Sequence, residues 1–417
     1  MNQSPIEASA RSMKDSSHHL VLRTTAEKNR LLKDIAYRLH LRAAAILEAN
    51  KRDLDHAKTI GLSATLTDRL VLDEQGIEHM IRGIKDVIAL PDPVGKVIER
   101  TKRPNGLRID RVRVPIGAIG IIYEARPNVT VDAAALCLKA GSSVLLRGGS
   151  EAIHTNRALV DVLRESLRHE KLPESCVGFV DSTDRQDVLV MVKQDRFLDV
   201  IIPRGSQQLI RFIQENSTVP VIAHGEGNCH VFVDDAADLK KAIEIVLNAK
   251  TQRPSVCNAA EKLLVHRKIA AKFLPVVIRR LREAHVEVRG DDTVRSIVPG
   301  VLPAEPSDWY REYLDLIISV KVVKDVSEAI EHINRYGSHH SDAIVSKSKK
   351  NSERFLAEID SAAVFANAST RFTDGYEFGL GAEIGISTQK LHARGPMGLA
   401  ELTSTKFVVR GTGQVRG

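Results

Sequence analysis

Between Ile116 and Ala223 the sequence alternates short apolar runs with helical segments, and this alternation constrains the fold more than any other feature. The apolar runs are GAIGIIYEA, SVLLR, SCVGFVD, LDVIIP and VPVIA. Amphipathic patterns such as ALVDVLRESLRHE lie between them and are typical of helices. Parallel strands need helical crossovers and are buried on both faces. This part of the chain therefore predicts a doubly wound α/β domain with five parallel strands.

The segments that flank this domain predict helices and an exposed ribbon. Residues 24–58 and 63–90 repeat apolar residues at helical spacing. Residues 107–115, LRIDRVRVP, alternate apolar and charged residues, and the tail contains the strand-like STKFVVRG. We expect the ribbon and the tail to pair as an arm, which in a chain of this size more often serves oligomerisation than catalysis.

A second α/β unit follows, as expected for a chain of 417 residues, which exceeds the length that one hydrophobic core usually serves. Its predicted helices span 268–284, 326–336 and 349–359, and residues 290–312 read as loop. Its predicted strands are KLLVH, VEVRG, IISVKVV, DAIVS and AAVFAN.

Composition excludes several classes of protein. The formal net charge of +7 is spread along the chain without a block of like charges, which is typical of a solvated surface or of an anionic substrate. The four cysteines lack CxxC spacing, so neither a zinc site nor a disulfide framework is indicated. No signal-like or membrane-spanning apolar segment occurs. We expect a cytoplasmic protein that binds neither a membrane nor a metal.

Two junctions between a strand and a helix are candidate phosphate cradles. VLLRGGSEA places Arg147, Gly148 and Gly149 at one junction, and VIIPRGSQQL places Gly205 and Ser206 at the other. Free N–H groups at such helix starts bind anions. A GxGxxG motif is absent, so a dinucleotide would bind in a way that differs from the usual Rossmann fingerprint.

Cys257 is the candidate nucleophile, because NAKTQRPSVCNAA surrounds it with cations and small residues. Nearby cations lower a thiol's pKa and raise its nucleophilicity. Cys137 and Cys176 lie in apolar segments typical of buried thiols, whereas Cys229 beside His230 is a competitor. The residues alone support a catalytic and a structural role for Cys257 about equally.

The chain contains, in this order, the segments YEARPNVTVD, LKAGSSVLLRGG, NAKTQRPSVCN, FANASTRFTDG and QKLHARGPMGL. These segments resemble the γ-glutamyl phosphate reductase family, also called glutamate-5-semialdehyde dehydrogenases, a branch of the aldehyde dehydrogenase superfamily. The resemblance implies an aldehyde dehydrogenase-like fold of three parts. An NADP-binding domain comprises 1–106 and 117–234, a catalytic domain 235–370, and an oligomerisation arm 107–116 and 388–417.

The resemblance also implies roles for single residues. Cys257 is the nucleophile, Asn128 donates to the oxyanion, and Glu312 holds the nicotinamide ribose. The two cradles bind NADPH, with Arg147 as the partner of its 2′-phosphate. The implied substrate is L-glutamyl 5-phosphate. A candidate protein partner is glutamate 5-kinase, which would supply that substrate. The implied assembly is a homodimer or homotetramer.

The loop NASTRFTDG offers Arg371 and Ser369 as further candidates for binding substrate. An arginine suits the substrate's α-carboxylate, although a role in a surface salt bridge is equally compatible with the sequence.

Two alternative functions remain. One is a hydrolytic aldehyde dehydrogenase, whose glutamate base would fall at or near Ile222, with Glu226 the only carboxylate between Val219 and Val233. The other is a nucleic-acid-binding protein with a redox-active cysteine, which the aromatic content of 4% disfavours.

Overall fold

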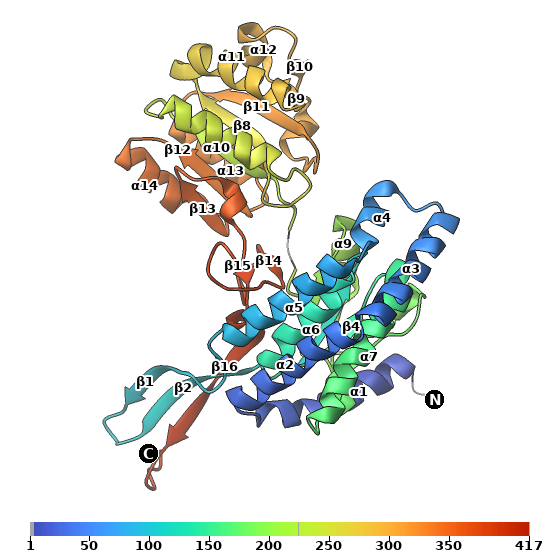
Figure 1. Cartoon of the computed structure of the whole chain (residues 1–417). Helices are drawn as coiled ribbons and strands as arrows, with labels where there is room; N and C mark the ends of the chain where they lie inside the picture. Colours follow the sequence, from blue (N-terminus) through green and yellow to red (C-terminus); the bar gives the residue numbers. More distant parts are fainter. Residues whose placement is uncertain (1–3, 224, 417) are drawn as a thin grey trace. The chain divides into compact units, whose positions relative to one another are not determined.

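The computed structural model describes residues 4–223 and 225–416, and the chain divides into two compact units (Figure 1). Unit 1 runs to Ala223 and also includes Gly379–Gly385 and the segment from Met397. Unit 2 runs to Phe378 and also includes Ile386–Pro396. None of the helices in the described residues is long and apolar enough to cross a membrane.

Unit 1 is built on a parallel four-stranded sheet in the order β5-β4-β3-β6. The strands are β3 (Ala118–Tyr123), β4 (Ser143–Arg147), β5 (Val177–Phe179) and β6 (Val200–Arg204). The prediction of VPVIA as a fifth strand is wrong, because this segment contributes a single bridge between Val221 and Ile201. Pro220 has no N–H to extend a ladder, and the chain leaves unit 1 at Ala223.

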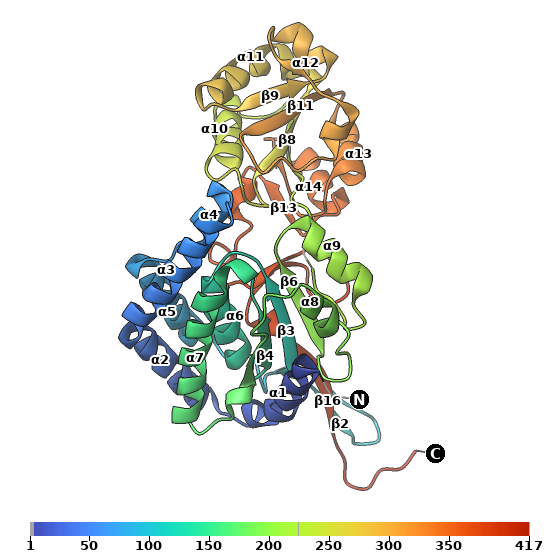
Figure 2. The same ribbon diagram turned by 90° about the vertical axis from the view of Figure 1, so that its right-hand side faces the viewer.

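Helices cover both faces of this sheet (Figure 2). On one side lie α6 (Asn128–Lys139) and α7 (Ile153–His169), backed by α2 (Thr25–Leu41), α3 (Ala43–Thr59) and α5 (Glu74–Ala89). On the other side lie α1 (Pro5–Val21), α8 (Gln186–Met191) and α9 (Gln207–Asn216). The short elements are α4 (Ala64–Leu70), η1 (Ser150–Ala152), η2 (Glu174–Cys176) and η5 (Ala400–Leu402). The sequence did not predict α1, whose Ile6, Ala10 and Met13 are buried against α8 and the sheet.

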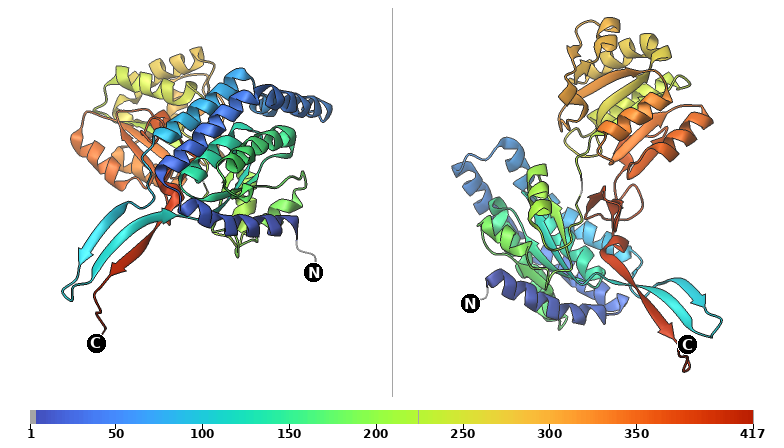
Figure 3. Two further views of the ribbon diagram at one scale, coloured as in Figure 1. Left: turned by 60° about the horizontal axis from the view of Figure 1, so that its bottom comes forward. Right: turned by 180° about the vertical axis from the view of Figure 1, so that it is seen from behind.

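The predicted arm is confirmed as a pairing of strands. The strand β2 (Arg108–Pro115) pairs antiparallel with β16 (Thr403–Arg410) and, on its other edge, with β1 (Val97–Lys102). The carboxylate of Asp110 ties the three strands together, because it accepts from Arg100 Nε at 2.7 Å and from Arg410 Nη1 at 2.9 Å. Figure 3 shows the arm leaving the helical body of unit 1.

Unit 2 is built on a seven-stranded parallel sheet in the order β10-β9-β11-β8-β7-β12-β13. The strands are β7 (Cys229–Val233), β8 (Ala260–His266), β9 (Glu287–Gly290), β10 (Leu302–Pro303), β11 (Ile317–Val323), β12 (Ser341–Val345) and β13 (Ala363–Ala366). All five predicted strands are present. A domain boundary at 234 would place β7 in the cofactor domain, whereas β7 pairs with β8 and β12 in the second sheet.

Helices flank this second sheet on both faces (Figures 1 and 3). The helices α10 (Leu239–Thr251), α11 (Arg267–Glu283) and α12 (Asp292–Ile297) pack on one face, and α13 (Val326–Tyr336) and α14 (Lys349–Glu358) on the other. Residues 290–312, predicted as loop, contain α12, β10 and η3 (Pro306–Trp309). The remaining elements are η4 (Thr370–Phe372), β14 (Gly385–Ser387) and β15 (Gly395–Met397).

Candidate active site

Cys257 differs from the other three cysteines in its exposure. It lies in the loop between α10 and β8 and is half-buried, whereas Cys137, Cys176 and Cys229 are fully buried. Burial raises the pKa of Cys176 to about 12 and raises the pKa values of Cys137 and Cys229 well above the usual value. These three thiols are therefore poor nucleophiles, and Cys257 is the cysteine that a substrate can reach.

The backbone of Cys257 rests on Gly227, in the loop that leads into the neighbouring strand β7. A Cβ atom at position 227 would overlap with the carbonyl oxygen of Cys257 and lie 2.5 Å from its Cα, so only glycine fits there. The Sγ of Cys229 donates to the same carbonyl oxygen at 3.1 Å. The start of β7 thus fixes the loop that carries Cys257.

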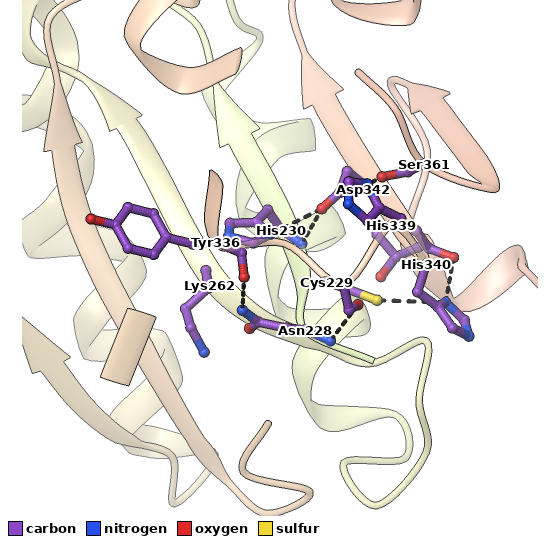
Figure 4. Close-up of polar contacts among 12 residues, drawn as sticks. Asn228, Cys229, His230, Lys262, Tyr336, His339, His340, Asp342 and Ser361 are labelled. Carbon is purple, nitrogen blue, oxygen red and sulfur yellow. Dashed lines mark hydrogen bonds and ion pairs between the residues drawn. The ribbon is translucent and has the colours of Figure 1, made fainter. Parts of the chain in front are cut away.

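Behind Cys229 lies a buried polar network (Figure 4). The Sγ of Cys229 faces Nδ1 of His340 at 3.8 Å, and this nitrogen also contacts Ser341 Oγ at 2.8 Å. Burial lowers the pKa of His340 to about 4, so its ring is neutral at physiological pH. His339 instead contacts the carbonyl oxygen of Asp360, so these two adjacent histidines do not converge on one point.

Glu312 reaches the same glycine that supports Cys257. Its Oε1 accepts from the N–H of Gly227 at 2.9 Å, and burial, the largest of several influences, raises its pKa to about 7. The adjacent carbonyl oxygen of Arg311 accepts from Lys262 Nζ at 2.7 Å, and burial lowers the pKa of this lysine to about 7. Glu312 and Cys257 therefore both contact Gly227, within unit 2.

Arg371 is also tied to the residues around Cys257. Asn258, directly after the cysteine, donates to the carbonyl oxygens of Arg371 and Thr373 at 3.3 and 2.8 Å. The Nε of Arg371 donates to Gln252 at 2.8 Å, and its guanidinium makes no ion pair with any carboxylate in the described part of the chain. The hydroxyl of Ser369 accepts from the N–H of Arg371 at 3.3 Å and is buried, so it shapes the turn that presents Arg371.

In unit 1 the predicted phosphate cradles share one feature: each glycine approaches a polar side chain too closely for a Cβ atom. Such an atom would overlap with Asn156 at Gly148 and with Glu151 at Gly149, and it would lie 2.6 Å from Glu124 at Gly205. The Glu124 carboxylate accepts from the N–H of Ser206 at 2.7 Å and from its hydroxyl at 3.1 Å. The start of α9, predicted as a phosphate cradle, therefore binds a carboxylate of the chain itself, as helix starts bind anions in general.

Arg147 lies at the end of β4, directly before Gly148 and Gly149. Its Nη1 and Nη2 donate to the carbonyl oxygens of Gly148 and Asp184 at 3.1 and 3.3 Å. Its Nε is buried and has no partner among the described residues. A buried donor without an acceptor in that part of the chain, at the turn formed by Gly148 and Gly149, fits the phosphate groups of a dinucleotide.

Asn128 begins α6, just beyond the carboxyl end of β3. Its side chain is exposed, and its Nδ2 donates to Oδ2 of Asp132 at 2.9 Å. The loop that leads to it contains Ala125 at a φ of +38°, a conformation that costs free energy for a residue other than glycine. Glu151 accepts from the N–H of Ala125 at 2.6 Å and holds this strained turn.

Among the residues that the structure describes, one group of side chains could hold a cation, namely Asp234, Asp235 and His266 near the carboxyl ends of β7 and β8. Lys268 already donates to Asp235 at 2.9 Å. The N–H of Lys268 also donates to Nδ1 of His266 at 3.1 Å, which leaves the proton on Nε2. This arrangement is a hydrogen-bonded cap and does not favour a metal ion.

The structure adds two residues that the sequence did not suggest, Gly227 and Asp132. Gly227 lies in the glycine-rich segment GEGN. Such a segment indicates that another part of the backbone approaches closely, but it does not indicate which part. Asp132 lies four residues after Asn128, a spacing that puts two side chains on one face of a helix.

The family of the protein follows from comparisons with known proteins. Residues 25–298 match the model of the aldehyde dehydrogenase family. This match covers more than half of the chain, and the chain belongs to that family. A nicotinamide cofactor is therefore implied.

The relatives define the family more narrowly. A gamma-glutamyl phosphate reductase of Thermotoga maritima is 56% identical over 393 residues, covering 94% of this chain and 95% of that protein. One of Carboxydothermus hydrogenoformans is 55% identical and covers 98% of both chains. The crystal structure of the Thermotoga maritima reductase matches with a TM-score of 0.98 at 54% identity, over 99% of this chain and 100% of that chain. Within the aldehyde dehydrogenases, the chain thus belongs to the gamma-glutamyl phosphate reductase family.

Proposed function

We propose that the protein reduces L-glutamyl 5-phosphate to L-glutamate 5-semialdehyde, the second step of proline biosynthesis, through a thioester on Cys257. The observation that carries this proposal is that Cys257, alone of the four cysteines, is not fully buried and is held by Gly227 beside Glu312 and Arg371. The names of the nearly full-length relatives support the substrate.

The chemistry follows from the residues around the thiol. The thiolate of Cys257 attacks the acyl carbon, and the phosphate group leaves with the electron pair of the bond that breaks. We propose the amide of Asn128 and the backbone N–H of Cys257 as donors to the oxyanion, and one such donor contributes roughly 3 kcal/mol in comparable enzymes. The bound cofactor supplies the hydride that reduces the thioester. Collapse of the thiohemiacetal then releases the aldehyde and restores the thiolate.

We infer that the cofactor is NADPH. Arg147, whose buried Nε has no partner among the described residues, is the proposed partner of the 2′-phosphate. Gly148, Gly149, Gly205 and Ser206 line the proposed path of the other phosphates. Glu312 is the proposed partner of the nicotinamide ribose.

We also propose that the arm mediates homo-oligomerisation into a dimer or tetramer, because it exposes large apolar side chains. These are Val97, Ile98, Phe407 and Val409. We also propose that the protein is located in the cytoplasm, where thiols stay reduced. Glutamate 5-kinase is its proposed protein partner.

The direct test is the reverse reaction. Purified protein is mixed with pyrroline-5-carboxylate, which is in equilibrium with the open semialdehyde, together with NADP⁺ and inorganic phosphate. We expect formation of NADPH, measured by its absorbance. No turnover under these conditions would contradict the proposed function.

Removing the guanidinium of Arg371 is expected to weaken substrate binding. A bidentate contact with the α-carboxylate makes hydrogen bonds to a charged group, so Arg371→Ala should raise KM for the semialdehyde by about 10- to 100-fold. The KM for NADP⁺ should not change. Arg371→Lys should recover only part of the loss, because a lysine cannot bind the carboxylate bidentately. An equal loss for an aldehyde that lacks the α-carboxylate would rule this contact out.

The affinity for NADPH is expected to fall as the pH falls through 7. Burial raises the pKa of Glu312 to about 7, so its carboxylate is mostly ionised at pH 8 and mostly protonated at pH 6. The protonated form is a poorer acceptor for ribose hydroxyls, so Kd should rise by about 3- to 10-fold over this interval. Fluorescence titration of NADPH binding measures this change.

The matched control is Glu312→Gln, because this variant leaves the titration of the ligand's own phosphate in place. It should show the weaker affinity at both pH values, with a much smaller pH dependence. If the variant retains the pH dependence of the wild type, Glu312 is not the group responsible.

A further inference from the structure

Asp132 is a carboxylate that has no cationic partner among the residues that the structure describes. Its Oδ2 accepts from Asn128 at 2.9 Å, and this hydrogen bond is its only one within the described residues. Arg204 acts on it only through a longer-range attraction, so burial dominates and raises its pKa to about 6. A half-buried carboxylate in this state is stabilised by any positive charge that approaches it.

The place of Asp132 limits what can approach. It lies one helical turn after Asn128, on the same face of α6, and it contacts the amide group that is the proposed oxyanion donor. An acyl oxygen held by that amide would lie at most about 6 Å from the Asp132 carboxylate, since two hydrogen bonds of about 2.9 Å connect them. Asp132 is thus within reach of a substrate whose acyl group is at Asn128.

The substrate carries a positive charge at the right separation. In a glutamyl group four single bonds join the acyl carbon to the α-nitrogen, a span of roughly 5 Å when extended. We propose that Asp132 binds the α-ammonium group of the substrate and so selects α-amino acyl compounds over acyl compounds without an amino group. This inference rests on the proposed function and adds to it the recognition of a primary ammonium.

A purely positional role of Asp132 predicts a different result. If the carboxylate only orients the amide of Asn128, its loss should affect every substrate equally. If it binds the ammonium group, its loss should affect only substrates that have one. The two roles therefore separate when the same variants are tested on two aldehydes that differ only in the amino group.

The experiment compares glutamate 5-semialdehyde with 5-oxopentanoate, which has the same chain and carboxylate but no amino group. Both are oxidised with NADP⁺ and phosphate by the wild type and by Asp132→Asn. Asparagine keeps the shape and an oxygen that accepts from Asn128, but it has no charge. We expect kcat/KM for the amino substrate to fall by about 10- to 100-fold, mainly through KM, and to change less than about 3-fold for 5-oxopentanoate.

Two further variants serve as controls. Asp132→Glu retains the charge and should recover part of the preference for the amino substrate. Asp195→Asn removes an exposed carboxylate elsewhere in unit 1 and should change neither substrate. NADPH binding and Tm of each variant report on folding.

Equal losses for both substrates in Asp132→Asn, or no loss at all, would overturn the inference while leaving the proposed function intact. Failure of the wild type to oxidise either aldehyde would instead overturn the proposed function, and the inference with it.

Discussion

Replacing Cys257 with serine is expected to lower kcat by at least about 10⁴-fold, because loss of a nucleophile in well-studied enzymes costs this much or more. Serine is nearly isosteric but far less nucleophilic than a thiolate at neutral pH. The backbone contact with Gly227 and the hydrogen bond from Cys229 to the carbonyl oxygen do not involve the thiol of Cys257. Folding and NADPH binding should therefore persist, as measured by Tm and by fluorescence titration.

The matched control is Cys229→Ser. Its hydroxyl can still donate to the carbonyl oxygen of Cys257, so most activity should remain. A reversal, with Cys229→Ser inactive and Cys257→Ser active, would identify Cys229 as the nucleophile. That result would conflict with its complete burial beside His340.

Oxidation of the semialdehyde is expected to depend on phosphate or arsenate by about 10²-fold or more, since general base catalysis contributes 10²- to 10⁴-fold where it operates. If no base activates water, the thioester on Cys257 reacts slowly with water and is released mainly by attack of phosphate or arsenate. The measurement is the rate of NADPH formation in phosphate-free buffer and after addition of phosphate.

The structure supports the loss of this base. Ile222, at or near which the base is predicted to fall, is buried, and its N–H donates to the carbonyl oxygen of Ile201 at 2.9 Å. Glu226 is the carboxylate that most needs a control, because it precedes Gly227 in the loop that supports Cys257. Glu226→Gln should leave the slow, phosphate-free rate unchanged. Comparable rates with and without phosphate, accompanied by free glutamate, would favour the hydrolytic alternative.

Much of the fold could be predicted because its strands are buried on both faces. Continuous apolar runs such as SVLLR and IISVKVV are shorter than most helices and are typical of buried parallel strands, and both form such strands in the structure. VPVIA has a similar composition, but Pro220 and its position at the end of unit 1 prevent a ladder. An apolar run also does not indicate which sheet its strand joins. The predicted domain boundary at residue 234 therefore separates β7 from β8 and β12, the strands with which it pairs.

The candidate site was less predictable than the fold. Cys257 could be named as a candidate because cations and small residues surround it in the sequence itself, although these residues alone supported a structural role equally. The importance of Gly227 depends on a contact with Cys257, which lies far along the chain beyond α10, and no local pattern encodes such a contact. The same holds for Asp132. Its spacing from Asn128 can be read from the sequence, but the charges that surround its carboxylate depend on the folded structure.

The pairing of β2 with β16 has a consequence for how the chain is made. The side chains of Arg111 and Thr405, which are hydrogen-bonded across these strands, are 294 positions apart, and all of unit 2 lies between them. At about 5–20 residues per second, a ribosome needs roughly 15 to 60 s to cover that distance. During this interval β1 covers one edge of β2, and the other edge has no β16 to pair with. Unit 2 can therefore fold while unit 1 is still incomplete, and the last strand to be synthesised closes the arm.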